Sequence, residues 1–100
     1  MQFHYEPALR DYMNRKNHRT IVVELVEINN SDFEITELNV RFISPRQRHW
    51  FVDQKKYRPI PTDCGEVLLP AFPLTMEEPV TFGLRSFLWF HFLTYKGIKV

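Results

Sequence analysis

The segment from Arg46 to Arg58 holds the side chains best suited to contact a ligand. It places five cations beside Trp50, Phe51 and Tyr57, against one acidic residue, Asp53. On single-strand-binding surfaces, cations follow the phosphates and aromatic rings stack on the bases. The candidate interaction surface comprises Arg46, Arg48, His49, Trp50, Lys55, Lys56, Tyr57 and Arg58. We favour a solvated hairpin whose rings cover the core, because the whole chain carries a net charge of only +1.

The histidine and acidic residues make a weaker case for catalysis. His49 and Asp53 would share one face of an extended strand, but ~3.3 Å per residue would set them about 13 Å apart. His91 lies in the most apolar run, which favours a hydrogen-bonded core residue over a ligand. A site assembled from His49, Asp53 and His91 remains an alternative. We otherwise predict no catalytic residue, no metal site and no cofactor, and expect a protein that is not an enzyme.

Cys64 is the single cysteine, so the chain has no internal disulfide and suits a reducing compartment. It lies in a turn with acidic neighbours, which raise the pKa of a thiol and favour a structural role. The N-terminus lacks the basic and apolar regions of a signal peptide. The longest apolar run, 87–93, is far shorter than the ~20 residues of a membrane helix. We therefore expect a cytoplasmic protein without a membrane partner.

Length and composition predict a single domain over residues 1–100, with a helix at 7–17 and a β-rich region at 20–100. The helix has apolar residues at helical spacing, and Pro7 suits its first turn. Aromatic residues make up 15% of the chain, and nine of them are Phe. This is more aromatic surface than a small core needs, so part of it is expected to meet a partner.

The stretch 20–43 organises the predicted sheet. It reads as two apolar strands, 20–28 and 33–43, joined by Asn, Ser and Asp residues that favour a hairpin turn. The first strand is apolar on both faces, so it should be covered on both sides. The second strand changes phase, which predicts a β-bulge near Thr36 and Glu37.

Shorter strands follow in the second half of the chain. We predict strands at 49–52, 66–69 and 80–84, and Pro59–Ile60–Pro61 restricts its segment to a sheet edge. The Pro-spaced segment 69–79 is typical of a crossing between sheets or along a sheet edge. Residues 87–95 could form a helix, but their aromatic content favours a buried strand that turns at Lys96–Gly97.

These patterns indicate a mainly β fold with one N-terminal helix, as an antiparallel β-sandwich or rolled sheet of which the immunoglobulin-like form is one version. The favoured function is a non-enzymatic protein-interaction or assembly module that self-associates or joins a larger complex. Nucleic-acid binding through 46–58 is the first alternative. A ligand-binding or enzymatic site built from distant residues is the second.

Overall fold

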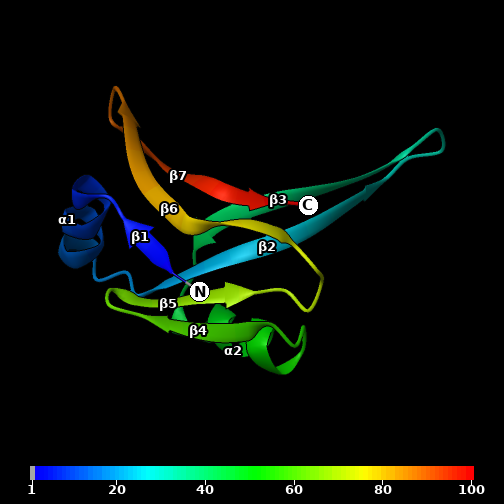
Figure 1. The fold of residues 1–100 in the computed structure, drawn as a ribbon, viewed down its shortest axis with the longest axis horizontal. Coiled ribbons are helices and arrows are strands. Elements are labelled where there is room, and N and C mark those ends of the chain that lie inside the picture. The colour runs from blue at the N-terminus through cyan, green and yellow to red at the C-terminus, as the bar shows by residue number, and fades with distance from the viewer. Residues whose placement is uncertain (1) are drawn as a thin grey trace.

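The computed structural model describes residues 2–100 (Figure 1). Its elements follow in the order β1 (Phe3–Tyr5), α1 (Pro7–Lys16), β2 (Thr20–Asn29), β3 (Glu34–Phe42), α2 (Pro45–Asp53), β4 (Arg58–Thr62), β5 (Gly65–Leu69), β6 (Thr75–Phe87) and β7 (Phe90–Lys99). The predicted mainly β fold and its N-terminal helix are confirmed. The expectation of one helix is wrong, because α2 occupies part of the region expected to be β-rich.

The strands form two sheets, with the orders β1-β6-β7 and β3-β2-β5-β4. Strand β5 leads to β6 in the other sheet, so the predicted crossing is confirmed. The pairs β1–β6 and β2–β5 are parallel, so the expected antiparallel arrangement is wrong for them. Parallel neighbours need long connections, and each of these pairs is separated by other elements of the chain. An immunoglobulin-like form stays a prediction.

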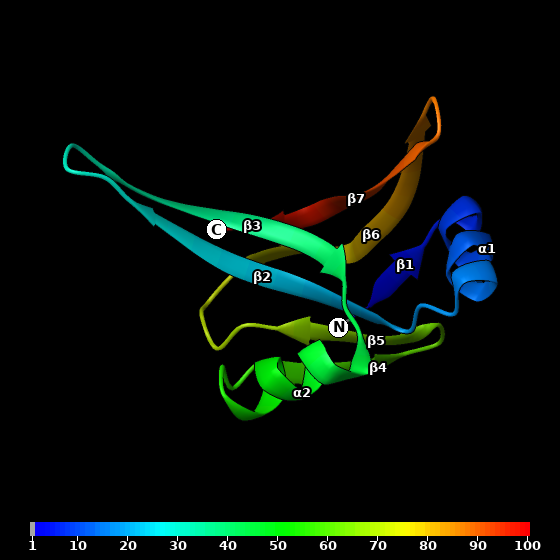
Figure 2. The same ribbon diagram turned by 180° about the vertical axis from the view of Figure 1, so that it is seen from behind.

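The main core lies between the two sheets, with α1 at one end (Figure 2). It contains Tyr5, Leu9, Met13, Ile21, Val23, Val67, Leu69, Val80, Phe82 and Ile98. The alternation predicted for 80–84 is confirmed, because Val80 and Phe82 are buried and Leu84 packs beside them. Leu9 and Met13 are the buried side of α1.

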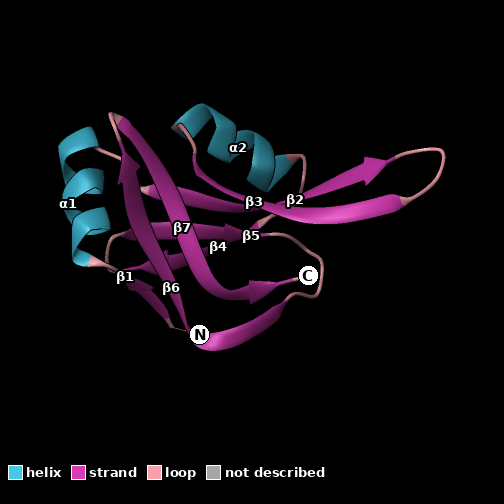
Figure 3. Cartoon of the chain, turned by 90° about the horizontal axis from the view of Figure 1, so that it is seen from above, coloured by secondary structure: helices cyan, strands magenta, loops and turns pink. Residues whose placement is uncertain are grey.

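A second, smaller core lies on the other face of the four-stranded sheet, where α2 covers it (Figure 3). It contains Val22, Ile43, Phe51, Tyr57 and Leu68. Strand β2 therefore supplies Ile21 and Val23 to the main core and Val22 to the second core. The prediction that this strand is covered on both faces is confirmed for its first half.

The predicted β2–β3 hairpin is confirmed, but its bulge is wrong. The register runs without a break from Ile21 opposite Phe42 to Asn29 opposite Glu34. The hairpin extends beyond both cores, so its outer residues are exposed. The apolar residues of β3 change phase because the outer part of this strand lies beyond the core. Burial therefore no longer determines which face of that part is apolar.

The segment 87–95 is not a helix, but the prediction of one buried strand is wrong, because the segment contains the end of β6, a turn and the start of β7, and most of it is exposed. The turn falls at Leu88–Trp89, between β6 and β7, and Leu88 has a φ of 56°. Gly97, expected in the turn, has a φ of 89° within β7, opposite an irregular register of β6 between Met76 and Thr81. A glycine signal can mark a bulge as well as a turn, and here it marks a bulge.

The other short strands agree with their sequence signals. Strand β5 covers the predicted 66–69, and β4, with its two prolines, lies at the edge of its sheet. Gly65 follows the predicted turn with a φ of 149°, and an added Cβ there would lie 2.0 Å from the carbonyl oxygen of Arg19. Only glycine permits so close an approach of the two chain segments.

Candidate functional site

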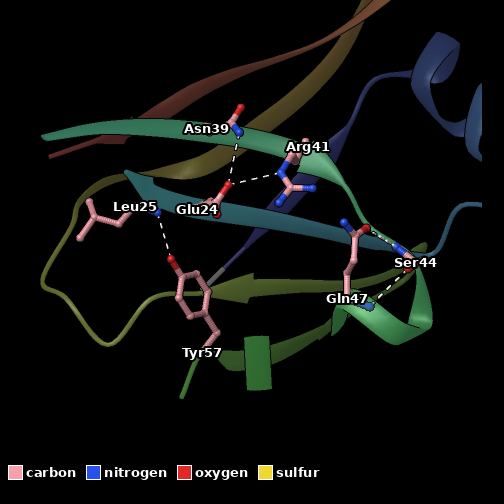
Figure 4. Close-up of polar contacts among 7 residues, drawn as sticks. All are labelled: Glu24, Leu25, Asn39, Arg41, Ser44, Gln47 and Tyr57. Atoms are coloured by element: carbon pink, nitrogen blue, oxygen red, sulfur yellow. Dashed lines mark hydrogen bonds and ion pairs between the residues drawn. The ribbon is translucent and has the colours of Figure 1, made fainter. Parts of the chain in front are cut away.

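The basic-aromatic segment 46–58 begins with a helix. Ser44 accepts a hydrogen bond from the Gln47 backbone, and the Gln47 side chain accepts one from the Ser44 backbone (Figure 4). This capping box, with Pro45 in the first turn, defines the start of α2. The expected strand at 49–52 is therefore wrong, and the aromatic residues Trp50 and Phe51 lie on different sides of a helix.

Two of the eight candidate residues are engaged within the fold. Arg48 forms an ion pair with Glu66, and its Nη2 lies 3.0 Å from Glu66 Oε1. Hydrogen bonding from Arg48 holds the pKa of the Glu66 carboxyl below its ordinary value. The Tyr57 hydroxyl accepts a hydrogen bond of 3.0 Å from the Leu25 backbone (Figure 4), and burial raises the pKa of that hydroxyl. These residues join α2 and the segment after it to the sheet.

Trp50 remains on the surface of α2 with Lys55, whose Nζ lies 5.2 Å from the centre of the indole ring. Arg46, Lys56 and Arg58 are also exposed. A cation over an aromatic ring is itself favourable, so the Trp50 ring is already partly covered. The exposed part of the candidate surface is therefore one ring with one cation beside it, together with His49 and three further exposed cations.

His49 and Asp53 lie much closer together than expected. His49 Nδ1 is 3.4 Å from Asp53 Oδ2, because a helix brings residues four apart onto one face. Both side chains are exposed. His91 lies on β7, where it makes a 2.8 Å hydrogen bond with Ser86 Oγ, so its predicted core position is wrong. Strand β7, which carries His91, and helix α2 lie on opposite sides of the four-stranded sheet, so His91 does not join the α2 pair (Figure 1).

Cys64 lies in the β4–β5 turn, as predicted. Burial is the main cause that raises the pKa of its thiol, and the charge of Asp63 adds to it. Arg10 reaches this turn from α1 and donates a 2.7 Å hydrogen bond to Asp63, which lowers the pKa of that carboxyl. These contacts tie the turn to α1 and do not activate the thiol.

His18 lines a pocket that the sequence did not indicate. Its ring stacks on Phe42 at 4.3 Å, and burial lowers the pKa of His18. The pocket has a volume of about 370 Å³ and lies between the end of α1 and the start of α2. Its lining comprises Asn17, His18, Arg19, Thr20, Phe42, Ile43, Ser44 and Pro45. Its lining contains no carboxylate or thiol to act with the imidazole.

Five consecutive or near-consecutive large apolar side chains are exposed at the end of the β6–β7 hairpin, which we call the aromatic tip. It consists of Phe87, Leu88, Trp89, Phe90 and Phe92. These side chains are between 51% and 77% exposed, with Trp89 the most exposed. Sequence reasoning identified this run as the most apolar in the chain but placed it in the core. The high share of aromatic residues was the signal for an exposed group.

No family model matches this chain, and no curated protein or solved structure is significantly similar to it. Within residues 2–100, no group of His, Cys, Asp and Glu side chains could hold a metal ion. In the same described range, no helix has the length and apolarity that crossing a membrane requires.

Proposed function

We propose that this chain is a non-enzymatic protein-interaction or assembly module of the cytoplasm that binds through its aromatic tip. The observation that carries the proposal is the exposure of five large apolar side chains at one end of a hairpin. Monomeric proteins rarely expose a contiguous apolar patch of this kind unless it meets a partner.

The rest of the fold does not need the aromatic tip. The main core ends at Phe82, Leu84 and Leu93, and the second core lies on the far side of the other sheet. Burying five such side chains within the chain would contribute roughly 1.5–3 kcal/mol each, so their exposure forgoes a large stabilisation. A partner that covers them would recover it.

The residue types also suit a protein partner. Phe and Trp are enriched in the buried centres of protein interfaces, where a few aromatic residues supply most of the binding energy. A hairpin end is an accessible place for such a group, because neighbouring segments do not block a partner from approaching it. The polar His91 and Ser86 pair lies beside the rings and can complete the rim of a contact.

Site-specific photo-crosslinking in cells tests this proposal. A photoreactive phenylalanine analogue replaces Trp89, and in the control chain it replaces His49, which is exposed on α2. We expect protein adducts of defined mass at position 89 and not at position 49. Substituting Phe90→Ser and Phe92→Ser should remove those adducts. Adducts to lipid alone, or equal adducts at both positions, would contradict the proposal.

A further inference from the structure

We propose that the aromatic tip of one copy binds the acidic arm of a second copy. The acidic arm is the outer part of the β2–β3 hairpin, residues 27–37. This inference rests on the proposed function and names the surface that the aromatic tip recognises.

The acidic arm carries charge of one sign. It contains Glu27, Asp32, Glu34 and Glu37 and has neither Lys nor Arg. These four side chains have no ion-pair partner in residues 2–100, whereas Glu24, just inside the arm, is paired with Arg41 (Figure 4). The arm therefore has a net charge of −4 that no ion pair within residues 2–100 neutralises.

The acidic arm is also apolar along part of one face. Ile28 lies directly opposite Ile35, so both side chains project from the same side of the hairpin. Phe33 has the same parity as Ile35, and all three side chains are exposed. An aromatic partner surface could bury these residues while its flank meets Glu37, which lies opposite Val26 on the same face.

The outer part of the β6–β7 hairpin, which bears the aromatic tip, has the opposite charge. Residues 81–96 contain Arg85 and Lys96 and no acidic residue, whereas Glu77 and Glu78 lie at the other end of the hairpin. In the described part of the chain neither Arg85 nor Lys96 has an ion-pair partner. Arg85 lies opposite Phe92, so one cation adjoins the aromatic rings.

The register of each hairpin shows which charges share a face with the apolar side chains. Arg85 lies opposite Phe92, and Lys96 is four strand positions from Phe92, so both cations share the Phe92 face, roughly 13 Å apart. Glu37 lies opposite Val26 and shares the face of Ile28 and Ile35, whereas Glu27 and Glu34 project from the other face of the arm. An apolar contact between these two faces therefore brings Glu37 to the cations, and Glu27 and Glu34 add to the negative potential of the arm. Complementary potentials of this kind steer association and fix its register.

One chain cannot make this contact with itself. The β2–β3 and β6–β7 hairpin ends point to different sides of the molecule in all three ribbon views (Figures 1, 2 and 3). In a reciprocal pair, each copy contributes both its aromatic tip and its acidic arm. This doubles the contact and brings it toward the roughly 20–30 residues a side of a standard interface.

Charge reversal in two different copies tests the inference by sedimentation velocity. The arm variant carries Glu27→Lys, Glu34→Lys and Glu37→Lys, and the tip variant carries Arg85→Glu and Lys96→Glu. All five positions are exposed. We expect the wild type to self-associate and each variant alone to associate at least about tenfold more weakly, because like charges then face one another.

Mixing the two variants is the decisive step. In the mixture, the positively charged arm of the arm variant meets the negatively charged β6–β7 hairpin of the tip variant. The second contact joins the unchanged tip of the arm variant to the unchanged arm of the tip variant, so it keeps the wild-type charges. We expect association to return in the mixture. The control variants Asp11→Lys and Lys16→Glu change exposed charges on α1 and should associate like the wild type.

The outcomes separate this inference from the proposed function. An arm variant that associates like the wild type, or a mixture that stays monomeric, would overturn the arm as the binding surface. A monomeric wild type that still forms protein adducts at position 89 would overturn self-association and leave the proposed function intact. A monomeric wild type that sediments only with anionic lipid vesicles and forms no protein adduct would overturn both.

Discussion

Phe82→Ala is expected to lower the free energy of unfolding by about 3–5 kcal/mol, whereas Trp89→Ala should change it by less than about 0.5 kcal/mol. The Phe82 ring is fully buried and lies 5.8 Å from the rings of both Phe3 and Tyr5. Removing it leaves a cavity in the main core. Trp89 has more area to lose, but 77% of it is already in solvent.

Urea denaturation at low protein concentration checks this contrast, because dilution removes any contribution from association. Phe82→Leu is the matched control, since it keeps an apolar side chain and should cost less than Phe82→Ala. A Trp89→Ala variant as unstable as Phe82→Ala would show that the tip stabilises the fold and would weaken its assignment as a binding surface.

Phe51→Ala is expected to cost about 3–5 kcal/mol as well, because Phe51 is the buried residue through which α2 contacts the second core. Its ring packs against Tyr57 at 5.0 Å, and the guanidinium of Arg41 lies 5.7 Å from its centre. Trp50→Ala, one residue earlier on the same helix, should have a much smaller effect because Trp50 is about half exposed.

Thermal unfolding followed by far-UV circular dichroism distinguishes the two α2 variants. Phe51→Ala should unfold at a clearly lower temperature than Trp50→Ala. Equal midpoints would mean that α2 does not use Phe51 to hold the second core, and the account of the two cores would be wrong.

The fold was predictable where the local sequence pattern and burial in the core favour the same structure. The stretch 20–43 forms its hairpin because Asn, Ser and Asp favour the turn and β-branched residues favour the strands. The first half of β2 is apolar on both faces and is covered on both faces. Beyond residue 26 the hairpin leaves the core, and there the apolar pattern no longer reports burial.

The helix α2 was missed although its start signal is present. Ser44 with Gln47 three residues later, and Pro45 between them, match a capping box with Pro in the first turn. The aromatic residues Trp50 and Phe51 favour a strand at 49–52 instead. A strand would set His49 and Asp53 far apart, whereas the helix holds them together.

The position of the aromatic tip could not be read from the sequence. A continuous apolar run normally indicates a buried strand, and Leu88–Trp89 has none of the residues that favour a tight turn. The sequence therefore predicts a core position for this run. An apolar surface selected for binding has the same composition as a core, so only the three-dimensional arrangement separates them.

The fluorescence of Trp89 as a function of protein concentration tests the central claim most directly. The chain has two tryptophans, so Trp50→Phe leaves Trp89 as the single reporter. We predict the red emission of a solvated indole on dilution, and a shift to the blue as concentration rises and copies associate. In the arm variant the emission should stay red. Emission that is blue at every concentration, or red at every concentration, would contradict the claim that a second copy covers an exposed aromatic tip.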